Sequence, residues 1–207
     1  MPRVRQHVNP LKSDFLEIPD VPRIAAAPGQ RLEVELGSAE GYFLFERAAS
    51  CVDSLIVGVE IRRELAVAAQ EEAGRLGLRN VRSVFANMSL DLARLFSPGS
   101  VSVFHVNFPD PWFKSRQKKR RVMGPELFRA IHPLLVPGGS VSIMTDIFDL
   151  AMDAMASLEE DDALFVSAGE PWRFQKRPFV PERSRRERQC GDEGTRIWRL
   201  LYRRRGA

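Results

Sequence analysis

The sequence predicts a doubly wound α/β fold, in which a mainly parallel sheet carries helices on both faces. From residue 31 onward, short β-rich apolar runs alternate with longer amphipathic stretches, and this alternation is typical of βαβ units. The length of 207 residues, 44% of them hydrophobic and 28% charged, suffices to bury one sizeable core. We therefore expect a single domain over residues 28–207, preceded by an extended arm over residues 1–27.

Five apolar runs predict the strands of the parallel part of the sheet, and they lie at 31–37, 54–60, 81–87, 100–108 and 139–146. Apolar residues at near-helical spacing predict helices at 40–50, 62–76, 90–96, 125–134 and 148–158. Near the C-terminus, residues 164–169 and 196–204 predict two further strands that pair like a hairpin, joined by an Arg- and Pro-rich loop. Because ligands of doubly wound sheets bind at the carboxyl ends of the strands, we expect the chemistry there.

The composition argues against several classes of protein. No apolar run reaches the length of a transmembrane helix, and the first ten residues lack the apolar core of a secretory signal, so a cytoplasmic protein is expected. Cys51 and Cys190 lie far apart without metal-ligand spacing, so we expect neither a disulfide nor a metal site. His105 lies inside a predicted strand, where a structural role is expected.

The net charge of +4 is concentrated in two basic clusters. The first comprises Lys114, Arg116, Lys118, Lys119, Arg120 and Arg121, and the second comprises Arg173, Lys176, Arg177, Arg183, Arg185, Arg186 and Arg188. A solvated surface loop would explain either cluster alone. Two clusters that flank the predicted ligand edge favour contacts with the phosphates of RNA.

The turn after the first strand favours a cationic ligand. Glu35 ends that strand, and Gly37 and Gly41 lie in the small-residue turn that follows, which permits close backbone approach. The spacing differs from the G-x-G-x-x-G fingerprint of dinucleotide-binding folds. Glu35 and Glu40 would repel a pyrophosphate, whereas they would attract a sulfonium and an amino group. The turn therefore favours S-adenosylmethionine over NAD, although a tight strand-to-helix turn without a ligand is an alternative.

Polar residues at the next two strand ends fit the remainder of that cofactor. Glu60 closes the second strand, where a carboxylate can accept both ribose hydroxyl hydrogen bonds. Asn87 closes the third strand, where an amide can pair with the adenine amino edge. Each has an alternative role as a strand-end turn residue, but their occurrence at successive strand ends favours a shared binding site.

Two prolines bracket Asp110 directly after the fourth strand, in F-P-D-P-W. They fix the backbone so that the carboxylate is held at the mouth of the crevice. Enzymes that methylate exocyclic amines commonly carry D/N-P-P-Y/F at this place, and the different motif here indicates a different target. Guanine N7 has a lone pair and no proton to remove, so its methylation needs orientation and charge balance rather than a strong base.

The chain resembles the tRNA (guanine-N7)-methyltransferase family, whose hallmark is a segment similar to F-P-D-P-W followed by basic residues. The similarity covers nearly the whole chain, through R-x-H-x-N-P near the N-terminus, V-E-L-G-x-x-x-G, G-V-E-I, F-P-D-P-W, K-K-R-R, P-G-G and T-D. It implies a Rossmann-like class I methyltransferase fold with a seven-stranded sheet. It also implies methyl transfer from S-adenosylmethionine to N7 of guanosine 46 in the tRNA variable loop, by a monomer or homodimer that needs no partner subunit.

The resemblance also implies roles for single residues. Cofactor contacts are implied for Glu35, Glu60, Asn87 and Asp110, with Asp110 also the catalytic residue, and substrate contacts for Lys114, Asp146, Ser184 and Glu187. A carboxylate at Asp146 can accept hydrogen bonds from the N1–H and 2-amino groups of guanine, which adenine cannot offer. Arg186 stands where the family usually has an aromatic residue. The alternatives are methylation of another RNA or of a small molecule, and a non-catalytic RNA-binding protein with this fold.

Overall fold

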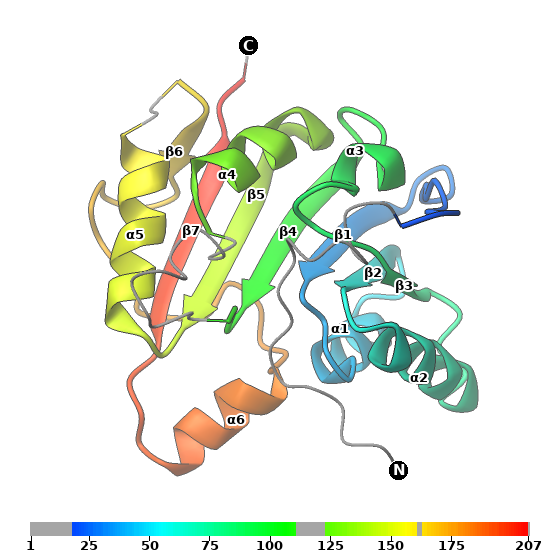
Figure 1. Cartoon of the computed structure of the whole chain (residues 1–207). Helices are drawn as coiled ribbons and strands as arrows, with labels where there is room; N and C mark the ends of the chain where they lie inside the picture. The colour runs from blue at the N-terminus through cyan, green and yellow to red at the C-terminus, as the bar shows by residue number, and fades with distance from the viewer. Residues whose placement is uncertain (1–17, 111–122, 161–162, 207) are drawn as a thin grey trace.

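A computed structural model describes residues 18–110, 123–160 and 163–206. In these residues seven strands form one sheet with the order β3-β2-β1-β4-β5-β7-β6 (Figure 1). The strands are β1 (Arg31–Leu36), β2 (Ser54–Glu60), β3 (Val81–Phe85), β4 (Val101–Asn107), β5 (Leu135–Thr145), β6 (Phe165–Ser167) and β7 (Trp198–Arg204). The pairings among β1 to β5 are parallel, and β7 is antiparallel to both β5 and β6. The predicted fold class is confirmed.

The helices cover both faces of this sheet. They are α1 (Tyr42–Ser50), α2 (Arg63–Arg75), α3 (Leu92–Leu95), α4 (Pro125–Ile131), which the 3-10 turn η3 (His132–Leu134) continues, α5 (Phe148–Glu159) and α6 (Arg185–Asp192). Successive side chains of β2 point to opposite faces of the sheet. Val57 packs into the main core with residues of α3, α4 and α5, whereas Ile56 packs against Leu44 of α1 and Ala73 of α2. Figure 1 shows α4 and α5 in front of the sheet.

The structure corrects two expectations near the C-terminal half. The fifth strand begins at Leu135 rather than at residue 139, because Leu135 already pairs with Val101 ahead of an irregularity in the β4–β5 register. The predicted Arg- and Pro-rich loop contains a further helix, α6. Ser184 caps this helix, and its hydroxyl accepts a hydrogen bond from the Glu187 amide at 3.2 Å. The S-x-x-E spacing is a capping-box signal that predicts such a helix start.

The described part of the predicted arm, residues 18–27, has no helix or strand but packs against the domain. Ile18 and Ile24 are buried. The Ile24 amide donates to the Leu95 carbonyl at 2.8 Å, and Arg94 donates to the Ile18 carbonyl at 2.9 Å. These contacts fasten the segment to α3. The boundary between arm and domain at residue 28 stays a prediction.

None of the helices in the described residues is long and apolar enough to span a bilayer. Within the same part of the chain, no three His, Cys, Asp or Glu side chains gather as metal ligands would. Cys51 and Cys190 are free thiols.

Candidate functional site

A cavity of about 450 Å³ opens at the carboxyl ends of β1, β2 and β4, where the topology predicts a ligand. It brings together six of the predicted site residues, namely Glu35, Gly37, Glu60, Asn87, Asp110 and Ser184. The walls come from the turn after β1, the ends of the three strands and the first turn of α6. Figure 1 shows α6 beyond the tips of β4 and β5. Gly41, Asp146 and Glu187 do not line this cavity.

The turn between β1 and α1 depends on its two glycines. Gly37 and Gly41 both have φ of 82°, a left-handed conformation that side chains rarely adopt. A Cβ at Gly41 would lie 2.7 Å from Cζ of Phe45 and 3.2 Å from Cβ of Ala69. Gly41 therefore permits the packing of α1 and α2 behind the turn, while Gly37 forms part of the cavity wall. The predicted cofactor contact of Gly41 stays a prediction.

Glu35 is a buried acid in the cavity wall with one oxygen left over. Asn107 Nδ2 donates to Glu35 Oε1 at 2.8 Å, whereas Glu35 Oε2 is buried and accepts no hydrogen bond from the described residues. Burial raises the pKa of Glu35 to about 8, and the negative charge of Glu60 adds to this rise while the bond from Asn107 opposes it. A cation placed at Oε2 would favour the ionised form of Glu35, so the site suits a positively charged ligand group.

Glu60 is also buried, but both of its oxygens are engaged. Oε2 accepts from the Ala39 amide at 2.8 Å and Oε1 from the Arg62 amide at 2.9 Å. The Arg62 guanidinium adds bonds of 2.7 Å to Oε1 and 3.0 Å to Oε2. A ribose diol at Glu60 must therefore share this carboxylate with Arg62 or displace its guanidinium. The sequence interpretation missed Arg62, whose position two residues after a strand-end acid is the signal that indicates it.

Asn87 and Asp110 lie at the neighbouring strand ends. Asn87 Oδ1 accepts from the backbone amide of Ser89 at 3.0 Å. The backbone amide of Asn87 donates to Asp91 Oδ2 at 2.9 Å, so both contacts hold Asn87 in the cavity wall. Asp110 lies two residues after Phe108, which has a positive φ of 50° and whose backbone amide donates to the Met144 carbonyl at 2.7 Å. This kink turns the chain at the strand end and places the half-buried Asp110 at the cavity.

Of the substrate-binding residues implied by the resemblance, Ser184 and Glu187 belong to the start of α6, whereas Asp146 directly follows β5. Lys114 lies outside the described residues. Asp146 Oδ2 lies 2.5 Å from a guanidinium nitrogen of Arg186, which itself lines the cavity. Glu187 is buried and accepts from Arg199 of β7 at 3.1 Å, so it ties α6 to the sheet. Ser184 and Glu187 thus act in the described structure as helix cap and anchor, and their substrate contacts stay predictions.

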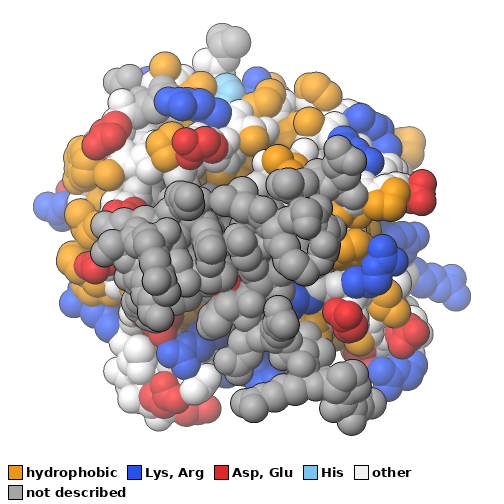
Figure 2. All heavy atoms as spheres, viewed as in Figure 1, with side chains coloured by type: hydrophobic (Ala, Val, Ile, Leu, Met, Phe, Trp, Pro, Cys, Tyr) orange, Lys and Arg blue, Asp and Glu red, His pale blue; other side chains and the backbone are white. Residues whose placement is uncertain are grey.

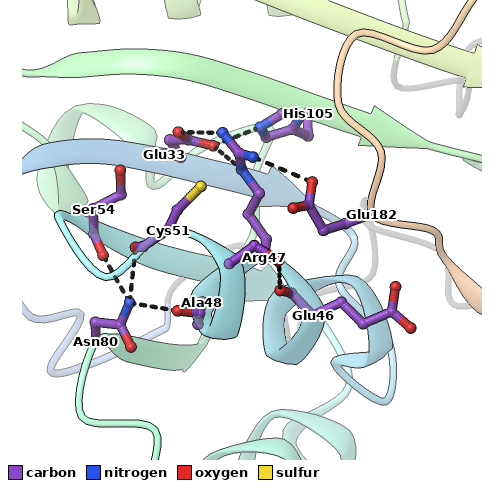
Figure 3. Close-up of polar contacts among 10 residues, drawn as sticks. Glu33, Glu46, Arg47, Ala48, Cys51, Ser54, Asn80, His105 and Glu182 are labelled. Carbon is purple, nitrogen blue, oxygen red and sulfur yellow. Dashed lines mark hydrogen bonds and ion pairs between the residues drawn. The ribbon is translucent and has the colours of Figure 1, made fainter.

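A buried polar network on the α1 face of the sheet fastens the segment that leads into α6 (Figure 3). Arg47 donates to both oxygens of Glu33 at 2.9 and 3.0 Å and to Glu182 at 3.2 Å, and His105 Nε2 lies 3.1 Å from Glu33. Burial favours the neutral form of Glu33, yet hydrogen bonds from His105 and Arg47 outweigh it and lower its pKa to about 2. His105 is structural, as expected, and burial lowers its pKa.

Replacing Arg47 with methionine should lower the free energy of unfolding by about 3 kcal/mol at pH 7, because Glu33 keeps a buried charge without its main partner. The pKa of Glu33 is lowered, so its stabilisation is complete above its ordinary value of 4.5 and is lost as the pH falls toward 2. The difference between variant and wild type should shrink over that pH range. Urea titrations at several pH values measure it.

The matched control is Arg75→Met, since Arg75 pairs with Glu72 on the surface and 73% of its side chain is exposed. That change should cost less than about 1 kcal/mol at every pH. Equal losses for the two variants would contradict the role given to Arg47.

The first basic cluster lies outside the described residues. Its members are Lys114, Arg116, Lys118, Lys119, Arg120 and Arg121. Their predicted contacts with RNA stay predictions.

The fold and the acidic cavity at the strand ends together define a class I S-adenosylmethionine-dependent methyltransferase fold. An rRNA methylase from Streptococcus thermophilus superimposes with a TM-score of 0.59 at 13% identity, covering 86% of this chain and 89% of that one. A Streptococcus mutans protein described as "a putative methyltransferase" in complex with SAH superimposes with a TM-score of 0.55 at 11% identity, covering 84% and 89%.

Sequence comparison identifies the family within this class. A family model described as "Putative methyltransferase" matches residues 29–200. The tRNA (guanine-N(7)-)-methyltransferase of Thermosynechococcus vestitus is 37% identical over 98% of this chain and 95% of its own length. The chain therefore belongs to the tRNA (guanine-N(7)-)-methyltransferase family, and the resemblance stated from its motifs is confirmed.

Proposed function

We propose that this protein transfers the methyl group of S-adenosylmethionine to N7 of guanosine 46 in the variable loop of tRNA. The observation that carries the proposal is the cavity that joins Glu35, Glu60 and Asp110 beside α6, in a chain 37% identical to a tRNA (guanine-N(7)-)-methyltransferase. Position 46 comes from the family resemblance of the motifs. The arrangement of strand-tip acids and the basic surfaces support the proposal for this chain.

The polar side chains of the cavity fit S-adenosylmethionine. The buried Oε2 of Glu35 has no hydrogen-bond donor among the described residues and suits the ammonium of the methionine part. Glu60 would hold the ribose hydroxyls in competition with Arg62, and Asn87 the adenine. When bound, the cofactor supplies a methyl group on a positively charged sulfur. The chain's own acids contribute the negative potential that draws such a cation into a low-dielectric site.

Asp110 would act on the base without removing a proton. N7 of guanine gains positive charge as it takes up the methyl group, and a carboxylate fixed beside it stabilises that charge in the transition state. Asp146 would accept hydrogen bonds from the N1–H and 2-amino groups of the same base and so fix its orientation. Because adenine has no N1–H and no 2-amino group, Asp146 would favour guanine over adenine.

A second cavity, of about 600 Å³, supports an RNA path on the α1 face of the sheet. Its floor includes Met144 of β5, which alternates with the core residues Val141 and Ile143 and so points away from α4 and α5. Arg173, Lys176, Arg177 and Arg199 line it together with Phe174 and Phe179. On the face seen in Figure 1, the visible Lys and Arg side chains of the described residues are interspersed with Asp and Glu (Figure 2).

This cavity is near the proposed base site, because Met144 lies two residues before Asp146 and pairs with Arg199 of β7. RNA whose guanine reaches Asp146 can therefore pass its phosphates along this basic surface. Three residues of the second basic cluster, Arg173, Lys176 and Arg177, thus line the second cavity. The others lie in or next to α6, and they are Arg183, Arg185, Arg186 and Arg188.

The double variant Lys176→Ala/Arg177→Ala should weaken tRNA binding about tenfold at 0.1 M salt, since both side chains are exposed in the groove. The slope of log Kd against log salt should fall by about 1 to 2, which corresponds to one or two lost phosphate contacts. Filter binding at several salt concentrations measures both quantities.

Arg75→Ala/Arg79→Ala is the control for net charge, because these exposed arginines lie at the end of α2 and in the following turn, outside both cavities. It should leave the slope unchanged. If Lys176→Ala/Arg177→Ala behaved like this control, the second cavity would not lie on the RNA path.

The proposed function is tested by incubating the purified protein with tRNA and S-adenosylmethionine and analysing the nucleosides by mass spectrometry. 7-Methylguanosine should form, and it should be lost when the guanosine at position 46 is replaced by adenosine. Labelled methyl groups in other RNAs but not in tRNA would favour a different RNA substrate. Cofactor binding without transfer to any RNA would favour a non-catalytic RNA-binding protein.

A further inference from the structure

The carboxylate proposed to bind guanine is engaged by an arginine of the same chain. The Arg186 guanidinium lies 2.5 Å from Asp146 Oδ2, and the side chain of Asp146 is only 13% exposed. Arg186 reaches this position from the first turn of α6, and it also lines the cofactor cavity. A guanine that binds to Asp146 therefore meets Arg186 first.

The guanidinium and the guanine edge offer the same chemistry to a carboxylate. Arginine presents neighbouring N–H groups in a planar fork, which matches the two oxygens of a carboxylate. Guanine presents N1–H and its 2-amino group in the same plane with a similar spacing. Arg186 and guanine are thus competitors for one acceptor, and Asp146 cannot serve both fully.

Arg186 is poorly placed to stabilise its own helix. It is the second residue of α6 after the Ser184 cap, where the positive end of the helix dipole disfavours a cation. Other contacts anchor α6, namely the cap itself, the pair of Glu187 with Arg199, and the pair of Arg188 with Glu46. The remaining charge partner of Arg186, Glu193, lies 3.8 Å away. The contact with Asp146 is therefore the main interaction of this side chain.

We propose that Arg186 is a latch on the guanine site, which holds Asp146 in the free enzyme and is displaced when the target guanine enters. The proposal rests on the proposed function, because it takes Asp146 as the guanine acceptor. The latch reduces the fraction of enzyme whose Asp146 is free to bind the guanine, and the apparent Kd for tRNA rises in inverse proportion to that fraction. RNA without a guanine at the target position does not open the latch and is not affected by it.

The test compares Arg186→Met with wild type on two tRNA transcripts, one with guanosine and one with adenosine at the target position. Methionine approximates the aliphatic stem of arginine, has a similar helix propensity and removes the charged guanidinium. With guanosine, Kd and KM should fall about three- to tenfold while kcat changes less than twofold, as expected for loss of a partly buried ion pair. With adenosine, Kd should not improve.

Two further variants keep the test decisive. Arg186→Lys retains a charge but loses the fork, so its gain in affinity should be smaller than that of methionine. Asp146→Asn/Arg186→Met should bind the guanosine transcript no more tightly than Asp146→Asn alone, because the amide lacks the negative charge and the second oxygen that hold Arg186. Thermal melting checks that each variant is folded.

The outcomes separate the latch from the function beneath it. If wild type forms no 7-methylguanosine, the proposed function fails before any variant is considered. If wild type is active but Arg186→Met binds both transcripts more weakly than wild type, and by the same factor, Arg186 is a phosphate contact and the latch proposal is wrong. Unchanged binding of the guanosine transcript would also overturn it.

Discussion

Replacing Asp110 with asparagine should lower the rate of guanine methylation at saturating substrates by about 10²- to 10³-fold. Asparagine has the shape of aspartate and keeps the kink after Phe108, but it removes the negative charge that we place beside the methyl acceptor. The effect should appear in kcat, because the charge acts on the transition state rather than on ground-state binding. Single-turnover methylation with an excess of enzyme measures this step directly.

Asp149→Asn provides the matched control, since Asp149 is exposed in the first turn of α5 and lines neither cavity. Its rate should equal that of wild type. Melting temperatures and the Kd for tRNA should be similar in all three proteins. A rate within threefold of wild type for Asp110→Asn would exclude a major electrostatic role and leave Asp110 as a turn residue.

The sequence predicts the carboxyl edge of the sheet well because that edge follows from local signals. Apolar runs fix the strands, and the residue that ends each run then lies at one common edge by the rules of parallel sheets. Glu35, Glu60, Asn87 and Asp110 could therefore be grouped in the correct cavity without coordinates. What brings them together is the parallel topology and not their spacing along the chain.

The partners of these acids could not be predicted, because they depend on side-chain directions across elements. The engagement of Glu60 by Arg62 and of Asp146 by Arg186 is visible only once the turn after β2 and helix α6 are in place. Helix α6 itself begins with a capping signal, but its three arginines and its polar composition resemble a loop. The first basic cluster lies outside the described residues, so its predicted contacts remain to be tested by mutation.

Replacing Glu35 with glutamine should stabilise the free protein and weaken cofactor binding. The pKa of Glu35 is raised to about 8, so folding favours its protonated form. Its contribution to stability is complete below the ordinary value of 4.5 and is lost as the pH rises through 8. Glutamine avoids this loss, so at pH 9 the variant should be more stable than wild type by about 3 kcal/mol and near pH 4.5 equally stable. Chemical denaturation at both pH values measures the difference.

The same substitution should raise the Kd for S-adenosylmethionine about 30- to 100-fold at pH 8, because the buried Oε2 loses its charge toward the ammonium. Below pH 8, binding of a cation beside Glu35 should release a proton from wild type and none from the variant. Calorimetry in buffers of different ionisation enthalpy detects that proton.

Glu40→Gln tests whether any acid at the cavity would give this result, since Glu40 lines the same cavity with a side chain that is 47% exposed. Its cofactor Kd should change less than threefold, and proton release should be that of wild type. If the ammonium of the cofactor bound at Glu40 on the rim, Glu40→Gln would weaken cofactor binding and Glu35→Gln would not. Proton release is expected only at Glu35, because burial raises the pKa of that carboxyl. The buried carboxylate of Glu35, whose Oε2 has no donor among the described residues, makes the free protein less stable at high pH, and the cofactor's charge would compensate that loss on binding.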